Sequence, residues 1–381
     1  MDMFTRVEPK RQSFTVKEDY GWEDIQNKDG SLYDLLSDYL SYDFPLWKRL
    51  EFSDFKKYPI KKYSGNFLRN GNLLLTQDAM KTELRDFTTG KFAGVDPKFV
   101  MMALIFFNSG VFGKIDKNER INLDYDLKDN KVVIENSGLI LEEDSSVIMI
   151  RSYRGEGKLL NSASKYLLRA GSKLKIFNVI ISPKTDLVIS SSLYNLEENA
   201  SLEVYDVIFG GEKTAIDHTA NLNGDFSRAT FKTVYFARGK ERMDLRNSLN
   251  HFGRSTYGRI ETNGSLSDEG YSVVRGNIEI KSTAVGADSE ERSNTISLSK
   301  KARADSIPSL YVDNNDVIAK HGASIGNIDE DKLYYLMSRG LDERSAIRLI
   351  VSGIFEPIIN EIPPDNSNLK EEIENAISVR I

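Results

Sequence analysis

Chemistry in this chain could come from its histidines, which are His218, His251 and His321. Imidazole is a borderline ligand that suits iron or zinc and binds when neutral. The chain has no cysteine, which excludes thiolate ligands, disulfides and cysteine nucleophiles. The histidines lie far apart in the chain, and their separation matches no short metal-ligand spacing. The residues alone therefore favour hydrogen-bonded histidines, with His218 and His251 at strand ends or in loops and His321 on the surface or at a sheet edge.

A second candidate is Ser324 in Gly322-Ala-Ser324-Ile-Gly326, which fits the G-x-S-x-G pattern of a nucleophile elbow. A hydrolase of that type needs its triad histidine after the serine, and here every histidine comes before it. We predict that the protein is not an enzyme. No segment fits G-x-x-x-x-G-K-[ST], so any ATP would have to be bound by another subunit.

The elements that must position His321 begin with a long β-prone region. From 111 to 321, short β-branched and aromatic runs alternate with Asn, Gly, Ser and Asp, without helical runs long enough for crossovers. Apolar positions recur at Val147, Leu174, Leu202 and Phe226, with intervals of 174 − 147 = 27, 202 − 174 = 28 and 226 − 202 = 24. A period of roughly 25 residues fits one turn of a parallel β-helix, because stacked turns bury a face that one turn cannot. A β-sandwich with irregular loops stays open at this point.

Helices are expected before that region. Residues 1–110 read as mainly helical, with Ser31 as an N-cap and Trp47 as an aromatic anchor. Pro97 can begin a helix that contains the apolar run from Phe99 to Phe107, and that helix should be buried.

Helices are also expected after that region. The two glycines of Gly322–Gly326 predict a turn directly after His321. Asp329 should cap the following helix, and Gly340 should end it. We expect two further helices, one from Asp342 to Gly353 and one that starts near Asn368, with Pro357 between them as a breaker.

Composition narrows the possible partners and location. Acidic residues outnumber basic ones, 57 to 51, and no basic stripe is present, so we expect no nucleic-acid partner. The longest apolar run, Phe99 to Phe107, is about half of the ~20 residues that a membrane-spanning helix needs. The first residues are charged and hold no apolar signal segment. A cytoplasmic protein without a membrane segment is the expectation.

Several short motifs follow one another in the last third of the chain. They are Arg275-Gly-Asn-Ile278, Pro308-Ser-Leu310, His321-Gly-Ala323, Leu333-Tyr-Tyr-Leu336 and Ser338-Arg-Gly-Leu341. In this order they resemble the SufB/SufD family of iron–sulfur cluster assembly proteins, and its SufD branch in particular. The resemblance implies a mainly β fold, in which a right-handed parallel β-helix core is flanked by helical regions. We therefore predict an N-terminal helical region at 1–110, the β-helix at 111–321 and a C-terminal helical region at 322–381.

The resemblance also implies a site and a partner. His321 matches the histidine that lies at the interface with a cysteine-bearing SufB partner, which makes it the candidate interface residue and metal ligand. Many relatives carry a cysteine where this chain has Ala319, and the SufB branch carries an acidic residue where it has Gly322. This chain is therefore expected to complete a site whose sulfur ligands come from elsewhere.

The remaining implications concern assembly. The resemblance implies pairing with a SufB-like paralogue, or with a second copy, and docking of the ABC-type ATPase SufC. The residues expected to contact SufC are Leu333, Tyr334, Leu336, Arg339, Gly340 and Ile347. It implies no permanently bound cofactor, a transient iron–sulfur cluster at the SufB interface, and ATP only through SufC. The alternatives are a carbohydrate-active β-helix enzyme and a SufB-like homodimeric scaffold, the latter weakened by the missing cysteine.

Overall fold

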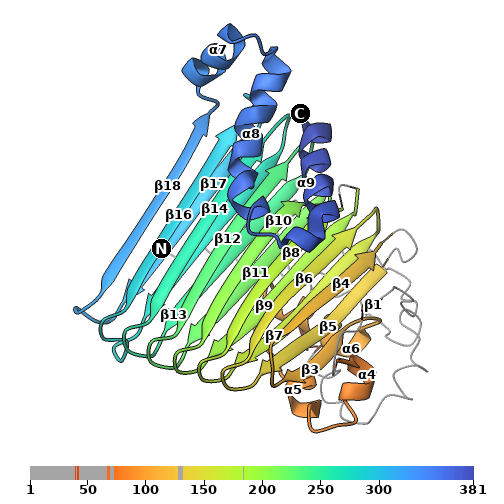
Figure 1. The fold of residues 1–381 in the computed structure, drawn as a ribbon, viewed down its shortest axis with the longest axis vertical. Coiled ribbons are helices and arrows are strands. Elements are labelled where there is room, and N and C mark those ends of the chain that lie inside the picture. The colour runs from red at the N-terminus through yellow and green to blue at the C-terminus, as the bar shows by residue number, and fades with distance from the viewer. Residues whose placement is uncertain (1–38, 40, 43–66, 69–72, 128–131, 183) are drawn as a thin grey trace.

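Strands dominate the computed structural model, which describes residues 39, 41–42, 67–68, 73–127, 132–182 and 184–381. They form two nine-stranded sheets (Figure 1). The first sheet runs in the order β1 (Phe67–Leu68), β4 (Glu119–Asp126), β6 (Ser146–Arg154), β8 (Lys173–Ile181), β10 (Ser201–Phe209), β12 (Arg228–Ala237), β14 (Tyr257–Leu266), β16 (Asp288–Ser297) and β18 (Ile318–Asn327). The second runs in the order β17 (Arg303–Val312), β15 (Tyr271–Ile280), β13 (Arg242–His251), β11 (Lys213–Leu222), β9 (Leu187–Leu196), β7 (Leu159–Leu168), β5 (Val132–Leu141), β3 (Val111–Ile115) and β2 (Leu74–Leu75).

From β3 onward, successive strands alternate between the two sheets, so each turn of the chain adds one strand to each. The strands pair in parallel, apart from the short β1 and β2, which pair antiparallel. This is a parallel β-helix, as predicted, and the β-sandwich alternative is wrong. Its strands extend to Asn327, beyond the predicted last residue, 321.

The register explains the sequence period. Val147 pairs with Leu174, and Leu174 pairs with Leu202, so the first two intervals of the sequence pattern separate true structural equivalents. Leu202 then pairs with Ala229, not with Phe226, and the third interval is 229 − 202 = 27. Phe226 lies in the preceding turn with φ 61° and is 51% exposed, so its assignment to the row was wrong.

Side chains of one kind stack along the interior of the β-helix. The rings of Tyr125 and Tyr153 stack with centroids 4.8 Å apart, and those of Tyr166 and Tyr194 with centroids 4.9 Å apart. These distances match the spacing of neighbouring strands, because each ring lies above its equivalent in the next turn. Apolar residues from both sheets form one continuous core between them. The stacked turns therefore bury a surface that no single turn could cover.

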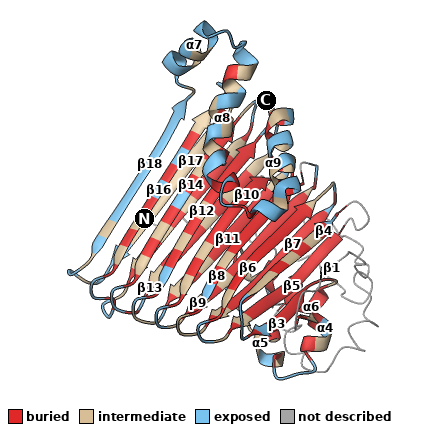
Figure 2. Ribbon diagram, in the orientation of Figure 1, coloured by how far each residue is buried: buried red, intermediate tan, exposed pale blue. Residues whose placement is uncertain are grey.

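Helices pack on part of the outer face of each sheet, and α7 (Glu330–Ser338) extends beyond the last strand (Figure 2). The helices are α4 (Thr76–Ala79), α5 (Arg85–Thr89), α6 (Pro97–Phe106), α7 (Glu330–Ser338), α8 (Glu343–Ile359) and α9 (Ser367–Arg380), with a 3-10 turn at Pro364–Asn366. α6 is buried, as predicted, and packs against the second sheet. α8 and α9 pack against the outer face of the first sheet, where Phe209 stacks on Phe355 with centroids 5.2 Å apart.

Several details of the helical regions differ from the sequence predictions. Gly322–Gly326 lies inside β18, so the predicted turn is wrong. α8 does not end at Gly353 but continues through Pro357 to Ile359. The helix caps at Asp329 and Asp342 are present, and Gly340 has the expected positive φ, 98°. The predictions for Ser31 and Trp47 lie outside the described residues.

Candidate functional site

The last turn of the β-helix leaves both sheets with an unpaired edge. β17 pairs only with β15, and β18 only with β16, within the part of the chain that the structure describes. Large apolar side chains on these two strands are exposed, namely Tyr311, Val312, Ile318 and Ile325. We call this surface, formed by β17 and β18, the open end. Unpaired strand edges with exposed apolar side chains favour the addition of another chain.

One row of interior side chains changes character at the open end. Through six turns the row is apolar and lies in the core, with Ile121, Met149, Ile176, Val204, Phe231 and Ile260 in register. The next two members are Glu291 on β16 and His321 on β18. Paired residues of parallel strands point to the same face of the sheet. Glu291 and His321 therefore both face the interior, on neighbouring strands about 4.8 Å apart.

Glu291 is buried without a compensating partner. Its side chain is 1% exposed, and neither carboxylate oxygen has a hydrogen-bond partner among the described residues. Gly276 on β15 faces it, and a Cβ there would lie 2.3 Å from the Cγ of Glu291, so the carboxylate packs on bare backbone. Burial raises the pKa of Glu291 to about 7, and the nearby Ser293 hydroxyl opposes this shift. A carboxyl in this setting favours a proton or a cation beside it.

His321 is exposed at the open end. It lies in the middle of β18, so the expectation that it stands between a strand and a turn is wrong, although it does lie at a sheet edge. A Cβ at Gly322, which points to the opposite face of β18, would also meet no atom within 4 Å, so the strand is open on that side too. Among the described residues, no group of three or more His, Cys, Asp or Glu side chains could hold a metal. The described residues thus place His321 and Glu291 on paired positions of neighbouring strands but assemble no complete metal site among themselves.

The other two histidines are buried and do not join His321. His218 lies in the middle of β11, with Nε2 3.0 Å from Oδ2 of Asp206, so its expected place at a strand end or in a loop is wrong. Burial opposes ionisation of Asp206, but His218 together with hydrogen bonds from Asn178 and Thr233 outweighs it, and the net effect lowers the pKa of that carboxyl. His251 is the last residue of β13, a strand end as expected.

The sequence reasoning missed a buried polar network in the interior. Arg151 and Glu135 are both fully buried, with Nη1 and Oε1 3.6 Å apart. Arg151 also donates from Nε to Oδ1 of Asn178 at 3.0 Å, and Asn178 donates to Oδ1 of Asp206 at 2.8 Å. The available signal was Arg151, an arginine directly after the apolar run Val147–Ile150 in the strand Ser146–Arg154. The contacts of Arg151, Asn178 and Asp206 step from one turn to the next within the first sheet, whereas the Arg151–Glu135 pair joins the two sheets, so the network ties both directions of the fold together.

The residues expected to contact SufC lie on α7, in the connection that follows it and at the start of α8. No residue of α7 is buried, and Tyr334 is 75% exposed. Leu333 and Leu336 are half-buried, and Ile347 packs against the core under α8. The Arg339 guanidinium lies 5.2 Å from the centre of the Tyr335 ring. The exposed members of this set, together with Leu349, which is 54% exposed, define what we call the α7–α8 surface; Ile347 lies beneath it.

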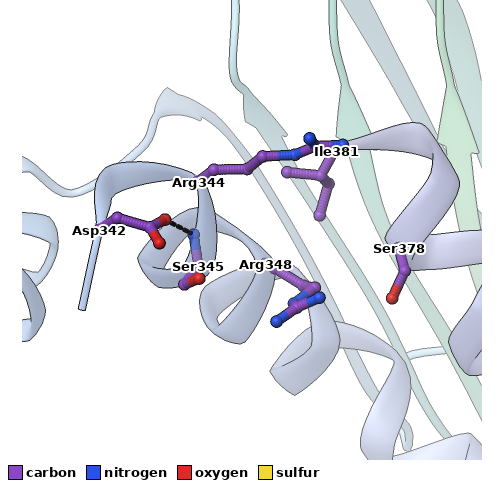
Figure 3. Close-up of a pocket in the computed structure, with 6 residues that line it drawn as sticks. All are labelled: Asp342, Arg344, Ser345, Arg348, Ser378 and Ile381. Carbon is purple, nitrogen blue, oxygen red and sulfur yellow. Dashed lines mark hydrogen bonds between the residues drawn. The ribbon is translucent and has the colours of Figure 1, made fainter.

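A small polar pocket separates the start of α8 from the end of α9 (Figure 3). Its volume is about 290 Å³, and its lining residues are Asp342, Arg344, Ser345, Arg348, Ser378 and Ile381. The Asp342 carboxylate accepts a hydrogen bond from the Ser345 backbone N–H at 2.8 Å, so it serves as the helix cap. The two arginines make the pocket basic.

Comparison with known proteins decides the family. The family description "SUF system FeS cluster assembly, SufBD core domain" matches residues 125–354. The chain belongs to the SufBD family. Over 296 residues it is 28% identical to the iron–sulfur cluster assembly protein SufD of Bacillus subtilis, a match that covers 72% of this chain and 64% of that protein. Over 201 residues it is 29% identical to SufB of the same organism, covering 49% of this chain and 43% of SufB.

A SufBD family protein of Mycobacterium leprae is 26% identical over 244 residues, covering 61% of this chain and 62% of that protein. The chain thus matches less than two thirds of the length of each of these relatives. The matched region, 125–354, contains the β-helix from β5 onward, the open end and the α7–α8 surface. Within the described residues, no helix combines the length and apolar character needed to cross a membrane.

Proposed function

We propose that this chain is a SufD-like scaffold subunit of the iron–sulfur cluster assembly machinery, working in the cytoplasm and without catalytic turnover of its own. The observation that carries the proposal is the open end, where the unpaired edge of β18 presents His321 inside the segment that matches the SufBD family. A SufB-like chain would cover this end. The cluster under assembly is cargo at that junction, and this chain holds no cofactor permanently.

In this proposal, the ligand that this chain provides to the cluster under assembly is the imidazole of His321. His321 is exposed in the single chain, so a covering partner would meet it directly. The chain has no cysteine, so thiolates at the junction would come from the partner. This division of ligands favours a SufB-like partner over a second copy, since two copies would bring imidazole and carboxylate but no thiolate.

The α7–α8 surface is the proposed docking site for a SufC-type ATPase. Its exposed Tyr334 and Leu349 offer apolar anchors, with Arg339 near them. α8 also packs on β10, β12 and β14, so it links the docking surface to the first sheet. In a pair of scaffold chains that each carry one ATPase, movement of the ATPases would be transmitted to the open end through α8. ATP enters the function only through that partner.

The test of the SufC surface needs point variants. Removing every residue from Asp329 onward would also remove α8 and α9, which cover the apolar face of the first sheet. Tyr334→Ala and Leu349→Ala change exposed side chains only, and we expect each to reduce co-purification of SufC without lowering thermal stability. Val379→Ala, an equally exposed apolar position on α9, is the matched control and should retain SufC. Full SufC recovery by both α7–α8 variants would contradict the assignment.

The test of the scaffold function is co-expression with SufB and SufC, followed by anaerobic isolation of the complex. His321→Ala should leave the complex intact and lower its iron and sulfide content. Lys320→Ala is the control, because Lys320 is exposed and adjacent but alternates to the outer face of β18. Polysaccharide cleavage by the chain alone would instead support the carbohydrate-active alternative, which family membership disfavours.

A further inference from the structure

One buried group has no part in the fold or in the function proposed so far. Glu291 is 1% exposed, and both of its carboxylate oxygens lack a hydrogen-bond partner among the described residues. Other buried carboxylates are compensated: Glu135 accepts hydrogen bonds from Tyr125 and Ser162, and Asp206 lies against His218. A buried carboxylate that lacks such partners destabilises a fold, so its presence points to a ligand that compensates it.

The strand register shows on which side of Glu291 a compensating ligand could bind. On the inner side, Glu291 follows Ile260, an apolar core residue that can compensate no charge. On the outer side it pairs with His321, the last member of the same interior row. Across the interior, Gly276 presents no side chain, and its bare backbone leaves room for the carboxylate. The neighbours of Glu291 along its row are therefore an apolar side chain and the exposed imidazole. The Ser293 hydroxyl also lies near the carboxyl on the same strand, but it is neutral and cannot balance the charge.

We propose that Glu291 and His321 together form this chain's half of a binding site for a divalent cation of the ferrous type at the open end. A carboxylate oxygen and an imidazole nitrogen are both ligands that divalent iron accepts. Side chains on paired residues of adjacent strands start about 4.8 Å apart, close enough for one ion to contact both. Two ligands leave further coordination positions for water or for a covering chain, which agrees with the absence of a complete ligand set among the described residues.

That the bound ion is iron rests on the proposed function. That a cation site exists rests only on the placement of Glu291 and His321. The competing occupant of the site is a proton on Glu291, which would neutralise the carboxyl without any metal. These two occupants predict different results when the carboxylate is replaced by its neutral isostere.

The experiment titrates the full chain with Co²⁺, used alone as a redox-stable probe, at pH 7.5, and measures the dissociation constant by calorimetry. Glu291→Gln and His321→Ala should each weaken binding by about ten-fold or more, as removal of metal-site groups does. Glu290→Gln is the matched control, because Glu290 is the next residue, lies on the outer face and forms ion pairs with Arg259 and Arg292. It should bind Co²⁺ as the wild type does.

Two additions keep the test decisive. Glu291→Asp retains a carboxylate and should bind Co²⁺ more tightly than Glu291→Gln, which separates ligation from a change in packing. The double variant Glu291→Gln/His321→Ala should bind little more weakly than either single variant, since both groups hold one ion. Wild-type Co²⁺ affinity in Glu291→Gln, or equal loss in Glu291→Asp and Glu291→Gln, would overturn the proposal and leave a proton as the occupant.

Failure of this inference and failure of the proposed function look different. If the chain forms no complex with SufB, yet Co²⁺ binding depends on Glu291 and His321, the metal site is supported and the proposed scaffold function is contradicted. The opposite result is a complex that forms with SufB and whose cluster content depends on His321, while Glu291→Gln binds Co²⁺ and assembles clusters as the wild type does. That result would support the scaffold function and contradict the role of Glu291 as a metal ligand.

Discussion

His251 should make the fold sensitive to mildly acidic pH. The imidazole is fully buried, with Nδ1 2.8 Å from Oγ1 of Thr256 and Nε2 3.0 Å from Oγ of Ser289. Burial lowers its pKa from 6.5 to about 4. Between about pH 6.5 and pH 4, His251 is protonated in the unfolded chain but remains neutral in the folded chain. The free energy of unfolding therefore decreases as the pH falls through this range.

The size of the effect follows from the shift. Each pKa unit corresponds to about 1.4 kcal/mol, so lowering the pH from 7.5 to 5.0 should remove about 2 kcal/mol of unfolding free energy through His251 alone. The assay is urea denaturation of wild type and His251→Gln at both pH values. His251→Gln is less stable at pH 7.5 because it packs less well, but its deficit should shrink by about 2 kcal/mol at pH 5.0.

Thr256→Ala provides the control for that comparison. It removes the hydroxyl that contacts the ring while it keeps a titrating histidine, so its deficit relative to wild type should change much less with pH. An equal deficit for His251→Gln at pH 7.5 and pH 5.0 would refute the reasoning, because the ring would then titrate alike in the folded and unfolded chains.

Further predictions concern the interior and can be checked by the same urea assay. Arg151→Ala leaves the buried Glu135 carboxylate with its hydrogen bonds but without its cationic partner and should cost about 3–5 kcal/mol, while Arg151→Met combined with Glu135→Gln should recover part of that loss; equal costs for the single and double variants would argue against the ion pair. Gly264→Ala should cost about 1–3 kcal/mol, because the new Cβ would lie 2.0 Å from Cζ of Tyr235. Gly322→Ala meets no atom within 4 Å and should stay within about 0.5 kcal/mol of wild type in the isolated chain.

The architecture was predictable because its physical cause repeats along the sequence. Each turn must place apolar side chains over those of the previous turn, and the pairing of Val147, Leu174 and Leu202 shows this stacking directly. The one wrong member, Phe226, is apolar but lies in a turn. Periodicity records which residues are apolar, and the register is set by the hydrogen bonds between strands.

The end of the β-helix was harder to predict. Gly322 and Gly326 suggest a turn by local preference, yet the pairing of β18 with β16 along its whole length holds this segment in a strand. Gly353 and Pro357 similarly suggest a helix end, whereas the burial of Phe355 and Ile358 against the first sheet keeps α8 continuous. In both cases tertiary contacts outweigh the local signal.

The candidate site was predictable only in part. His321 could be singled out by the resemblance, but nothing in the sequence connects it with Glu291, which lies a full turn of the β-helix earlier in the chain. That connection needs the register, which sets the two residues side by side and facing inward. The ion pair of Arg151 and Glu135 was missed for a related reason, because its members come from different sheets and meet only across the interior.

The central claim is that the open end brings His321 to a cluster shared with a partner. The most direct measurement is the iron and sulfide content, per complex, of anaerobically isolated assemblies of this chain with SufB and SufC. We predict that His321→Ala yields an intact complex with clearly less iron and sulfide, and that Lys320→Ala matches wild type. An intact His321→Ala complex with the wild-type content of both would contradict the account.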